Sequence, residues 1–220
     1  MDKQYWDTFY KDHSFREDIS EYSTFARFCF DNFLNKEPKT LVELGCGNAR
    51  DALFFAQQGH YVLAVDQSID SEVKNNKHHS NLEFLESDFI RPMYCFYDGE
   101  TLYYHPTPNK INVFYSRFTL HSITEENQKE LLPKVYDFLD TGGLFCIEAR
   151  TIKDTKFGVG KHICDTTYFN DNHTRRFIDS QKFLNTVLSL GFKLLYFNEK
   201  DNLSVYKDDN PVLMRIILEK

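Results

Sequence analysis

Carboxylates and glycines are closely spaced in one stretch of the chain, "VELGCGNARD", which begins with Val42 and contains Glu43. A further carboxylate, Asp66, ends the apolar run "YVLAVD", and another, Asp88, precedes Phe89 in "SDF". A carboxylate at the end of a strand can accept hydrogen bonds from both hydroxyls of a ribose, and a neighbouring aromatic ring can pack on a base. The spacing therefore predicts a site for a ligand that contains a nucleoside.

The glycine turn itself does not have the pattern of a phosphate site. The dinucleotide pattern G-x-G-x-x-G fails because Arg50 stands at its third glycine position, and no G-K-[ST] follows. A purely structural turn would use the same glycines, since glycine adopts positive φ without strain. The carboxylates at successive strand ends favour the ligand site over that alternative.

Strand and helix patterns alternate along the chain, which predicts a doubly wound α/β sheet with helices on both faces, in a single domain over 1–220. Short apolar runs bounded by turn residues predict strands, and apolar side chains at helical spacing predict helices. The expected strands lie at 40–46, 61–66, 82–89, within 111–123, and at 143–150, 193–200 and 211–220. The expected helices lie at 20–34, 49–59, 68–80, 124–143 and 179–192.

Bulk composition limits the classes of partner. A net charge of −7 and a pI near 5.6 argue against binding duplex DNA or an anionic membrane through the overall field. Five cysteines without a C-x-x-C pair, no signal peptide and no apolar run of membrane-spanning length predict reduced thiols in a cytoplasmic protein. No metal site is expected, because the adjacent His78 and His79 have no cysteine pair beside them.

The stretch "VELGCGNARDALFFAQQGHYVLAVDQS" resembles the cofactor motif of class I S-adenosylmethionine-dependent methyltransferases. Its details are similar to the tellurite-resistance branch and to small-molecule methyltransferases of bacterial capsule gene clusters. The resemblance covers residues 41–150 well and 1–40 loosely. It implies a Rossmann-like sheet of seven strands, mostly parallel with an antiparallel last strand. A sulfonium cofactor carries no phosphate, so the missing third glycine agrees with this resemblance.

The resemblance also implies residue roles toward S-adenosylmethionine and its product S-adenosylhomocysteine. Glu43 and Asp51 would lie near the amino group, Asp66 at the ribose, and Asp88 with Phe89 at the adenine. Ala49 stands where the family has glycine more often, a mild departure because alanine fits most conformations except positive φ. The full expected cofactor set is Trp6, Tyr10, Glu43, Gly45, Cys46, Gly47, Asp51, Asp66, Gln67, Ser68, Asp88, Phe89 and Ser116.

Two strand ends supply candidates for the reacting substrate. Arg117 and His121 follow the fourth strand, where His121 could act as general base. Glu148 and Arg150 end the fifth strand and point to one side, with Glu148 as a second possible base. The alternative for each pair is an internal cap or ion pair.

A basic cluster follows in the polar loop that we expect at 151–179. Within "HTRRF", His173, Arg175 and Arg176 could bind phosphate or carboxylate through forked donors. Surface ion pairing with nearby aspartates is the alternative. Glycines 158 and 160 could let the loop close as a lid.

Together with the resemblance, these features predict methyl transfer to an oxygen or nitrogen of a small anionic metabolite, such as a phosphorylated capsule or sugar precursor. A thiol or metal-oxyanion acceptor, or a sensor or partner subunit that binds the cofactor without turnover, remains an alternative. Nucleic-acid methylation is disfavoured, because "YSRF" stands where amino-methylating DNA enzymes have N/D-P-P-[YF]. We expect a monomer or homodimer, with a helical cap at 1–37 and an insertion at 91–110.

Overall fold

A computed structural model describes residues 21–69, 71–76, 79–90, 95–97, 102–104, 111–170 and 173–220. The expected cofactor residues Trp6 and Tyr10, the first part of the expected cap, and most of the expected insertion lie outside these residues. In the insertion, Cys95–Tyr97 (β4) pairs antiparallel with Leu102–Tyr104 (β5). None of the helices in the described part of the chain is long and apolar enough to cross a membrane.

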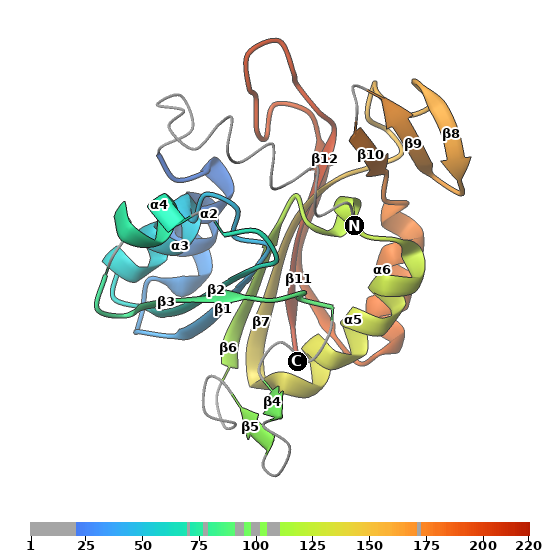
Figure 1. Ribbon diagram of the computed structural model, residues 1–220. Helices are drawn as coiled ribbons and strands as arrows, with labels where there is room; N and C mark the ends of the chain where they lie inside the picture. Colours follow the sequence, from blue (N-terminus) through green and yellow to red (C-terminus); the bar gives the residue numbers. More distant parts are fainter. Residues whose placement is uncertain are drawn as a thin grey trace.

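A seven-stranded sheet forms the centre of the molecule, in the order β11-β12-β7-β6-β1-β2-β3 (Figure 1). The neighbours from β7 to β3 are parallel, and β12 is antiparallel to both β7 and β11. This order confirms the expected Rossmann-like class with an antiparallel last strand. The strands are β1 (Thr40–Leu44), β2 (Tyr61–Asp66), β3 (Leu82–Glu86), β6 (Ile111–Arg117), β7 (Leu139–Arg150), β11 (Lys193–Lys200) and β12 (Leu213–Glu219).

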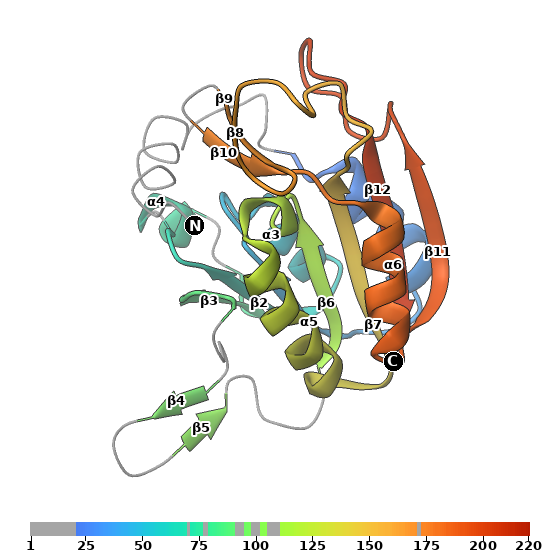
Figure 2. The same ribbon diagram turned by 90° about the vertical axis from the view of Figure 1, so that its right-hand side faces the viewer.

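Helices cover both faces of this sheet (Figures 1 and 2). One face carries α2 (Thr24–Cys29), η2 (Phe30–Leu34), α3 (Arg50–Gln57) and α4 (Ser71–Asn76), and the other carries α5 (Glu125–Phe138) and α6 (Ser180–Ser189). Side-chain caps fix three helix starts: Ser23 accepts from the amide of Ala26, Thr124 from that of Asn127, and Asp179 from those of Gln181 and Lys182.

Alternation along the strands divides the apolar side chains between two cores. In β2, Val62 and Ala64 belong to the core beneath α2 and α3, whereas Leu63 and Val65 belong to the core beneath α5 and α6. Because both faces are buried, these strands read as continuous apolar runs in the sequence. Because β1 and β2 are parallel, their carboxyl ends, where Glu43 and Asp66 lie, meet at one edge of the sheet.

Two expectations about the second half of the chain are wrong. The helix that we expected to reach Gly142 ends at Phe138, and β7 begins at Leu139. The polar segment expected as a loop contains a three-stranded antiparallel sheet, β10-β9-β8 (Figure 2). Its strands are Lys161–Cys164 (β8), Thr167–Asn170 (β9) and His173–Arg176 (β10). Four-residue strands that bury little apolar surface carry no periodic signal, so the sequence reads as loop.

Candidate active site

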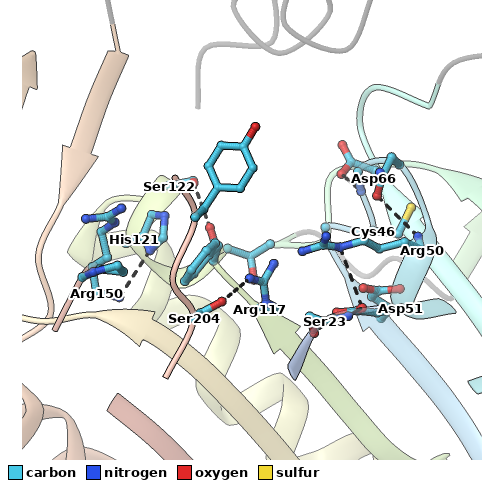
Figure 3. A pocket seen from close by; sticks show the side chains of 18 of the residues that line it. Ser23, Cys46, Arg50, Asp51, Asp66, Arg117, His121, Ser122, Arg150 and Ser204 are labelled. Carbon is cyan, nitrogen blue, oxygen red and sulfur yellow. Dashed lines mark hydrogen bonds and ion pairs between the residues drawn. The ribbon is translucent and has the colours of Figure 1, made fainter. Parts of the chain in front are cut away.

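A cavity of about 500 Å³ opens at the carboxyl ends of β1, β2, β6 and β7. Such an edge is where open α/β sheets bind ligands. We call Glu43, Asp51 and Asp66 the acidic end, and His121, Arg150, His173 and Arg175 the basic end. Figure 3 places Asp66 and Asp51 on one side, His121 and Arg150 on the other, and Arg117 between them.

The glycine turn after β1 forms the floor of the acidic end. The amides of Gly45 and Cys46 both donate to the carbonyl of Val65, which ties the turn to β2. Gly45 has a φ of +74°, and a Cβ at this position would collide with the side chain of Thr119. The turn therefore requires glycine for both its backbone conformation and its close approach to Thr119, which follows β6.

The departure at Ala49 is less mild than expected. Ala49 has a φ of +55° at the N-cap of α3, in the left-handed region where a side chain is strained. The glycine that is commoner here would relieve this strain. The sequence could not show it, because the backbone angle of a single turn residue leaves no pattern in the neighbouring residues.

Glu43 is buried at the end of β1 and lines the cavity. Its Oε2 has no hydrogen-bond partner among the described residues. Burial and then the negative charge of Asp51 raise the pKa of Glu43 well above 4.5, although Arg117 and Arg50 act in the opposite direction. The cavity thus presents a buried carboxyl oxygen with unused hydrogen-bonding capacity.

Asp51, in the first turn of α3, joins three elements and lines the cavity. Its Oδ1 accepts from the Ser23 amide at 2.7 Å, and its Oδ2 accepts from the Ser23 hydroxyl at 2.7 Å and from the Tyr115 hydroxyl at 2.8 Å. Arg50 Nε lies 4.0 Å from Oδ1. Asp51 therefore holds the start of α2 against β6, and any role toward a ligand is shared with this structural one.

Asp66 ends β2 and also lines the cavity. Its Oδ2 accepts from the Gly47 amide at 2.9 Å and its Oδ1 from the Ser68 amide at 3.1 Å. A carboxylate oxygen can accept more than one hydrogen bond, so both oxygens keep capacity for a ligand. The two backbone bonds fix the orientation of the carboxylate beside the glycine turn.

The remaining expected cofactor residues divide into two groups. Gly45, Cys46, Gly47 and Phe89 line the cavity. Gln67, Ser68, Asp88 and Ser116 do not. Asp88 instead accepts from the amide of Ile90, and the Ser116 hydroxyl bonds to that of Thr119.

Glu148 is not placed to act as a base. Its side chain is fully buried between two guanidinium groups, with Arg117 Nε 3.0 Å from Oε1 and Arg215 Nε 2.6 Å from Oε2. It does not line the cavity. The structure therefore shows the alternative of an internal ion pair for Glu148 and gives no support to its expected catalytic role. Arg117 does line the cavity, and it also donates to the hydroxyl of Ser204 at 2.8 Å.

His121 lies in the short 3-10 helix η3 (Leu120–Ser122) and lines the cavity. Burial and the positive charges of Arg175, Arg150, His173 and Arg176 lower the pKa of His121 well below 6.5, so the ring is neutral at neutral pH. The Arg150 amide is 3.5 Å from Nδ1. If Nδ1 accepts this bond, the proton of the neutral ring is on Nε2.

The two adjacent arginines of "HTRRF" face opposite ways. His173 and Arg175 line the cavity, but Arg176 donates to the carbonyls of Ile123 and Leu120, both at 2.8 Å, and to Gln128 Oε1 at 2.7 Å. Neighbouring residues of a strand point to opposite faces, so a double-arginine clamp cannot form on β10. Arg176 therefore ties β10 to the segment before α5, and the structure gives no support to its expected substrate role.

Two segments line the cavity that the sequence did not single out. Tyr22, Ser23 and Thr24 come from the start of α2, and Ser204, Val205, Tyr206, Asp209 and Pro211 come from the β11–β12 loop. The bond from Arg117 to Ser204 is one of those that hold this loop over the site. These residues show no motif, because their position depends on how distant strands are ordered in the sheet.

Comparison with solved structures identifies the class of fold. The chain superposes on 1,6-didemethyltoxoflavin-N1-methyltransferase from Burkholderia thailandensis, solved with 1,6-didemethyltoxoflavin and S-adenosylhomocysteine, with a TM-score of 0.70 and 15% identity. The match covers 99% of this chain and 86% of that one. For the glycopeptide N-methyltransferase MtfA with S-adenosylmethionine, the TM-score is 0.60 and the identity 13%, over 92% of this chain and 96% of that one. The fold is thus that of S-adenosylmethionine-dependent methyltransferases.

The expected tellurite-resistance relative is also among the structural matches. TehB from Haemophilus influenzae has a TM-score of 0.60 and 13% identity, over 89% of this chain and 61% of that one. No curated protein sequence matches the chain. The sequence profile of the family described as thiopurine S-methyltransferase matches residues 1–158, and the chain belongs to this family.

Proposed function

We propose that the protein transfers a methyl group from S-adenosylmethionine to a small anionic acceptor. The observation that carries this proposal is the division of one cavity into an acidic and a basic end. The acidic end suits a cofactor with an ammonium group and a ribose, and the basic end suits an acceptor with a carboxylate or phosphate. When bound, S-adenosylmethionine supplies an electrophilic methyl group on a sulfonium.

The residues of the acidic end fit this cofactor. The buried Glu43 Oε2 lacks a partner among the described residues and can accept from an ammonium group, with Asp51 nearby as a second carboxylate. Asp66 can accept from ribose hydroxyls while it keeps its bonds to Gly47 and Ser68. Phe89 offers a ring for the adenine. The glycines of the turn carry no side chain that would fill the space beside the cofactor.

The residues of the basic end hold and orient the acceptor. Arg150 and Arg175 supply forked donors suited to a carboxylate or phosphate. A neutral His121 with its proton on Nε2 donates to an acceptor oxygen, and only the other tautomer could remove a proton through Nε2. Positioning then supplies most of the rate enhancement, as in other reactions that join two bound reactants.

A thiol acceptor is the second candidate. Glu148 lies between two arginines away from the cavity, and among the described residues the basic end has no carboxylate apart from Asp209, itself ion-paired with Arg150. A thiol has a pKa near 8.5 and is partly ionised at neutral pH, so it needs less help from a base than a hydroxyl does. The name of the matching family, an S-methyltransferase, points the same way.

Turnover of matched acceptor pairs tests both parts of the proposal. Thiophenol, phenol and aniline would be compared with their 2-carboxylated forms and with a sugar phosphate, and formation of S-adenosylhomocysteine would be measured. We expect the carboxylated form to react faster in each pair, with the largest rates for thiols if the second candidate holds. Arg175→Ala should reduce the ratio of the turnover rates of the carboxylated and neutral acceptors. Lys161→Ala, which removes an exposed charge from the same small sheet, should leave this ratio unchanged.

Two other outcomes would reject parts of the proposal. Equal rates for acidic and neutral acceptors would reject the anionic substrate class. Binding of S-adenosylhomocysteine without turnover of any acceptor would favour a sensor or partner subunit.

A further inference from the structure

The β11–β12 loop places a carboxylate at the basic end of the cavity. Asp209 lies on this loop, lines the cavity and forms an ion pair with the guanidinium of Arg150. Lys156 Nζ lies 3.1 Å from its other carboxylate oxygen. The acidic group of Asp209 thus contacts one of the arginines that the proposed function assigns to the acidic group of an acceptor.

Arg150 has two carboxylate partners that differ in their surroundings. Asp154, four residues further along the chain, is 3.0 Å from NH1 of Arg150, and its side chain has no exposed surface. The side chain of Asp209 is 30% exposed and reaches Arg150 from the cavity side. Asp154 is therefore a permanent partner, whereas a ligand in the cavity can reach the position that Asp209 occupies.

The charge balance favours an exchange of one anion for another. The two carboxylates of Asp154 and Asp209 are offset by Arg150 and Lys156, and Arg175 adds positive charge to the same wall of the cavity. Burial raises the pKa of Asp209, but Arg150 and Lys156 outweigh it and keep this pKa below its ordinary range. Withdrawal of Asp209 leaves a buried guanidinium with a net positive environment, and an incoming carboxylate or phosphate restores the balance.

The loop is anchored at its base and carries Asp209 beyond that anchor. The Leu203 carbonyl accepts from Thr24 Oγ1 and from Arg215 NH2, both at 2.8 Å. Beyond it, Tyr206 and Asp209 exchange two backbone hydrogen bonds of 2.9 Å, which form a tight turn. The ion pairs of Asp209 with Arg150 and Lys156 hold this turn down over the cavity.

We propose that Asp209 occupies the anion subsite of the acceptor and that the acceptor's carboxylate or phosphate displaces it from Arg150. This inference rests on the proposed function, because it places the acceptor at the basic end. Asp209 is then a specificity-determining residue. A neutral molecule cannot replace the carboxylate on Arg150, whereas an anion exchanges with it and releases the turn. No bond is made or broken in this exchange.

Binding of benzoate and of its neutral isostere benzamide, measured by calorimetry with S-adenosylhomocysteine present, tests the inference. Asp209→Asn and Asp209→Ser should each bind benzoate about tenfold more tightly than the wild type, because no internal carboxylate competes for Arg150. Asp208→Asn, which removes the same charge from the exposed neighbouring position, should leave the benzoate affinity unchanged. The affinity for benzamide should not change in any variant.

The same samples report on the movement of the turn. Benzoate should accelerate amide hydrogen exchange over residues 203–210 in the wild type, and both Asp209 variants should exchange fast without it. Benzoate affinity that is equal or weaker in the Asp209 variants, or absent from them, would overturn the inference. Affinity for S-adenosylhomocysteine is measured first in each variant, so failure of the cofactor site is seen separately from failure of the anion exchange.

Discussion

The two ends of the cavity are built in different ways. The acidic end comes from one β-α-β unit, in which Glu43, Asp51 and Asp66 lie within 24 residues. Backbone hydrogen bonds within this unit orient Asp66, whereas Asp51 is also held by Ser23 and Tyr115. The basic end joins side chains from η3, β7 and β10, which are up to 54 residues apart, and the β11–β12 loop adds Asp209 beside them. Its charges are held by ion pairs such as those of Arg150 with Asp154 and Asp209.

This difference suits a site that binds the same cofactor in many enzymes but a different acceptor in each. A unit that is local in sequence fixes the spacing of its carboxylates largely by itself, which suits a ligand common to many enzymes. An end assembled from distant loops can change through any one of them, which suits the acceptor. Some charged residues near the basic end therefore face the ligand, whereas others form internal contacts that stabilise the fold.

Loss of Glu148 should have the largest effect. Glu148→Ala leaves Arg117 and Arg215 buried without their shared carboxylate, and we expect the free energy of unfolding to fall by about 3–5 kcal/mol in chemical denaturation. Glu219→Ala is the matched control, because its pair with the exposed Lys193 is worth less than about 1 kcal/mol. A Glu148 variant with unchanged stability and lost turnover would restore its role as a base.

Substitutions of the two adjacent arginines of β10 should have different effects, one on stability and the other on ligand binding. Arg176→Ala leaves the carbonyls of Leu120 and Ile123 without their buried donor, so the free energy of unfolding should fall by about 1–3 kcal/mol. Arg175→Ala should change stability less but weaken binding of an anionic acceptor. Denaturation and benzoate titration of the two variants check this, and equal effects of both on benzoate would contradict the opposite orientations.

Glu43 should lose a proton when the cofactor binds, which makes the binding affinity depend on pH. Its folded pKa is raised, so the proton on Glu43 stabilises the ligand-free fold below pH 4.5, and this contribution is lost as the pH rises through the folded pKa. An ammonium group requires the ionised form, so binding of S-adenosylhomocysteine should release a proton and tighten with pH by up to about tenfold per unit. Calorimetry in buffers of different ionisation enthalpy measures this release, and Glu43→Gln should abolish it. No proton release in the wild type would place the ammonium group elsewhere.

Ala49 should give the smallest effect. Ala49→Gly removes a side chain from a left-handed backbone position and should raise the free energy of unfolding by up to about 1 kcal/mol. Ala52→Gly, inside the same helix, should lower it by about 1 kcal/mol. Thermal unfolding of the pair would show this difference in sign, and a loss of stability at both positions would mean that Ala49 is not strained.

Local patterns explain why the sequence predicted the acidic end better than the basic end. Apolar runs and glycine turns gave β1, α3 and β2, and hence the edge at which Glu43 and Asp66 meet. The order of distant strands cannot be read locally, so Ser204 and Asp209 were missed. Residue type alone did not separate Glu148 from Arg150, which share one side of a strand, because ion pairing depends on Arg215 of the antiparallel neighbour. The sequence predicted that both arginines of "HTRRF" bind one anion, because it did not show that they lie on a strand and point to opposite faces.

We propose that one cavity holds the cofactor at its acidic end and an anionic acceptor at its basic end. Calorimetric titration of S-adenosylhomocysteine into the wild type, Asp66→Asn and Arg175→Met tests this division of the cavity. We expect an affinity that falls by about tenfold or more in Asp66→Asn and stays unchanged in Arg175→Met. Equal losses in both variants, or no binding to the wild type, would contradict the assignment of the two ends.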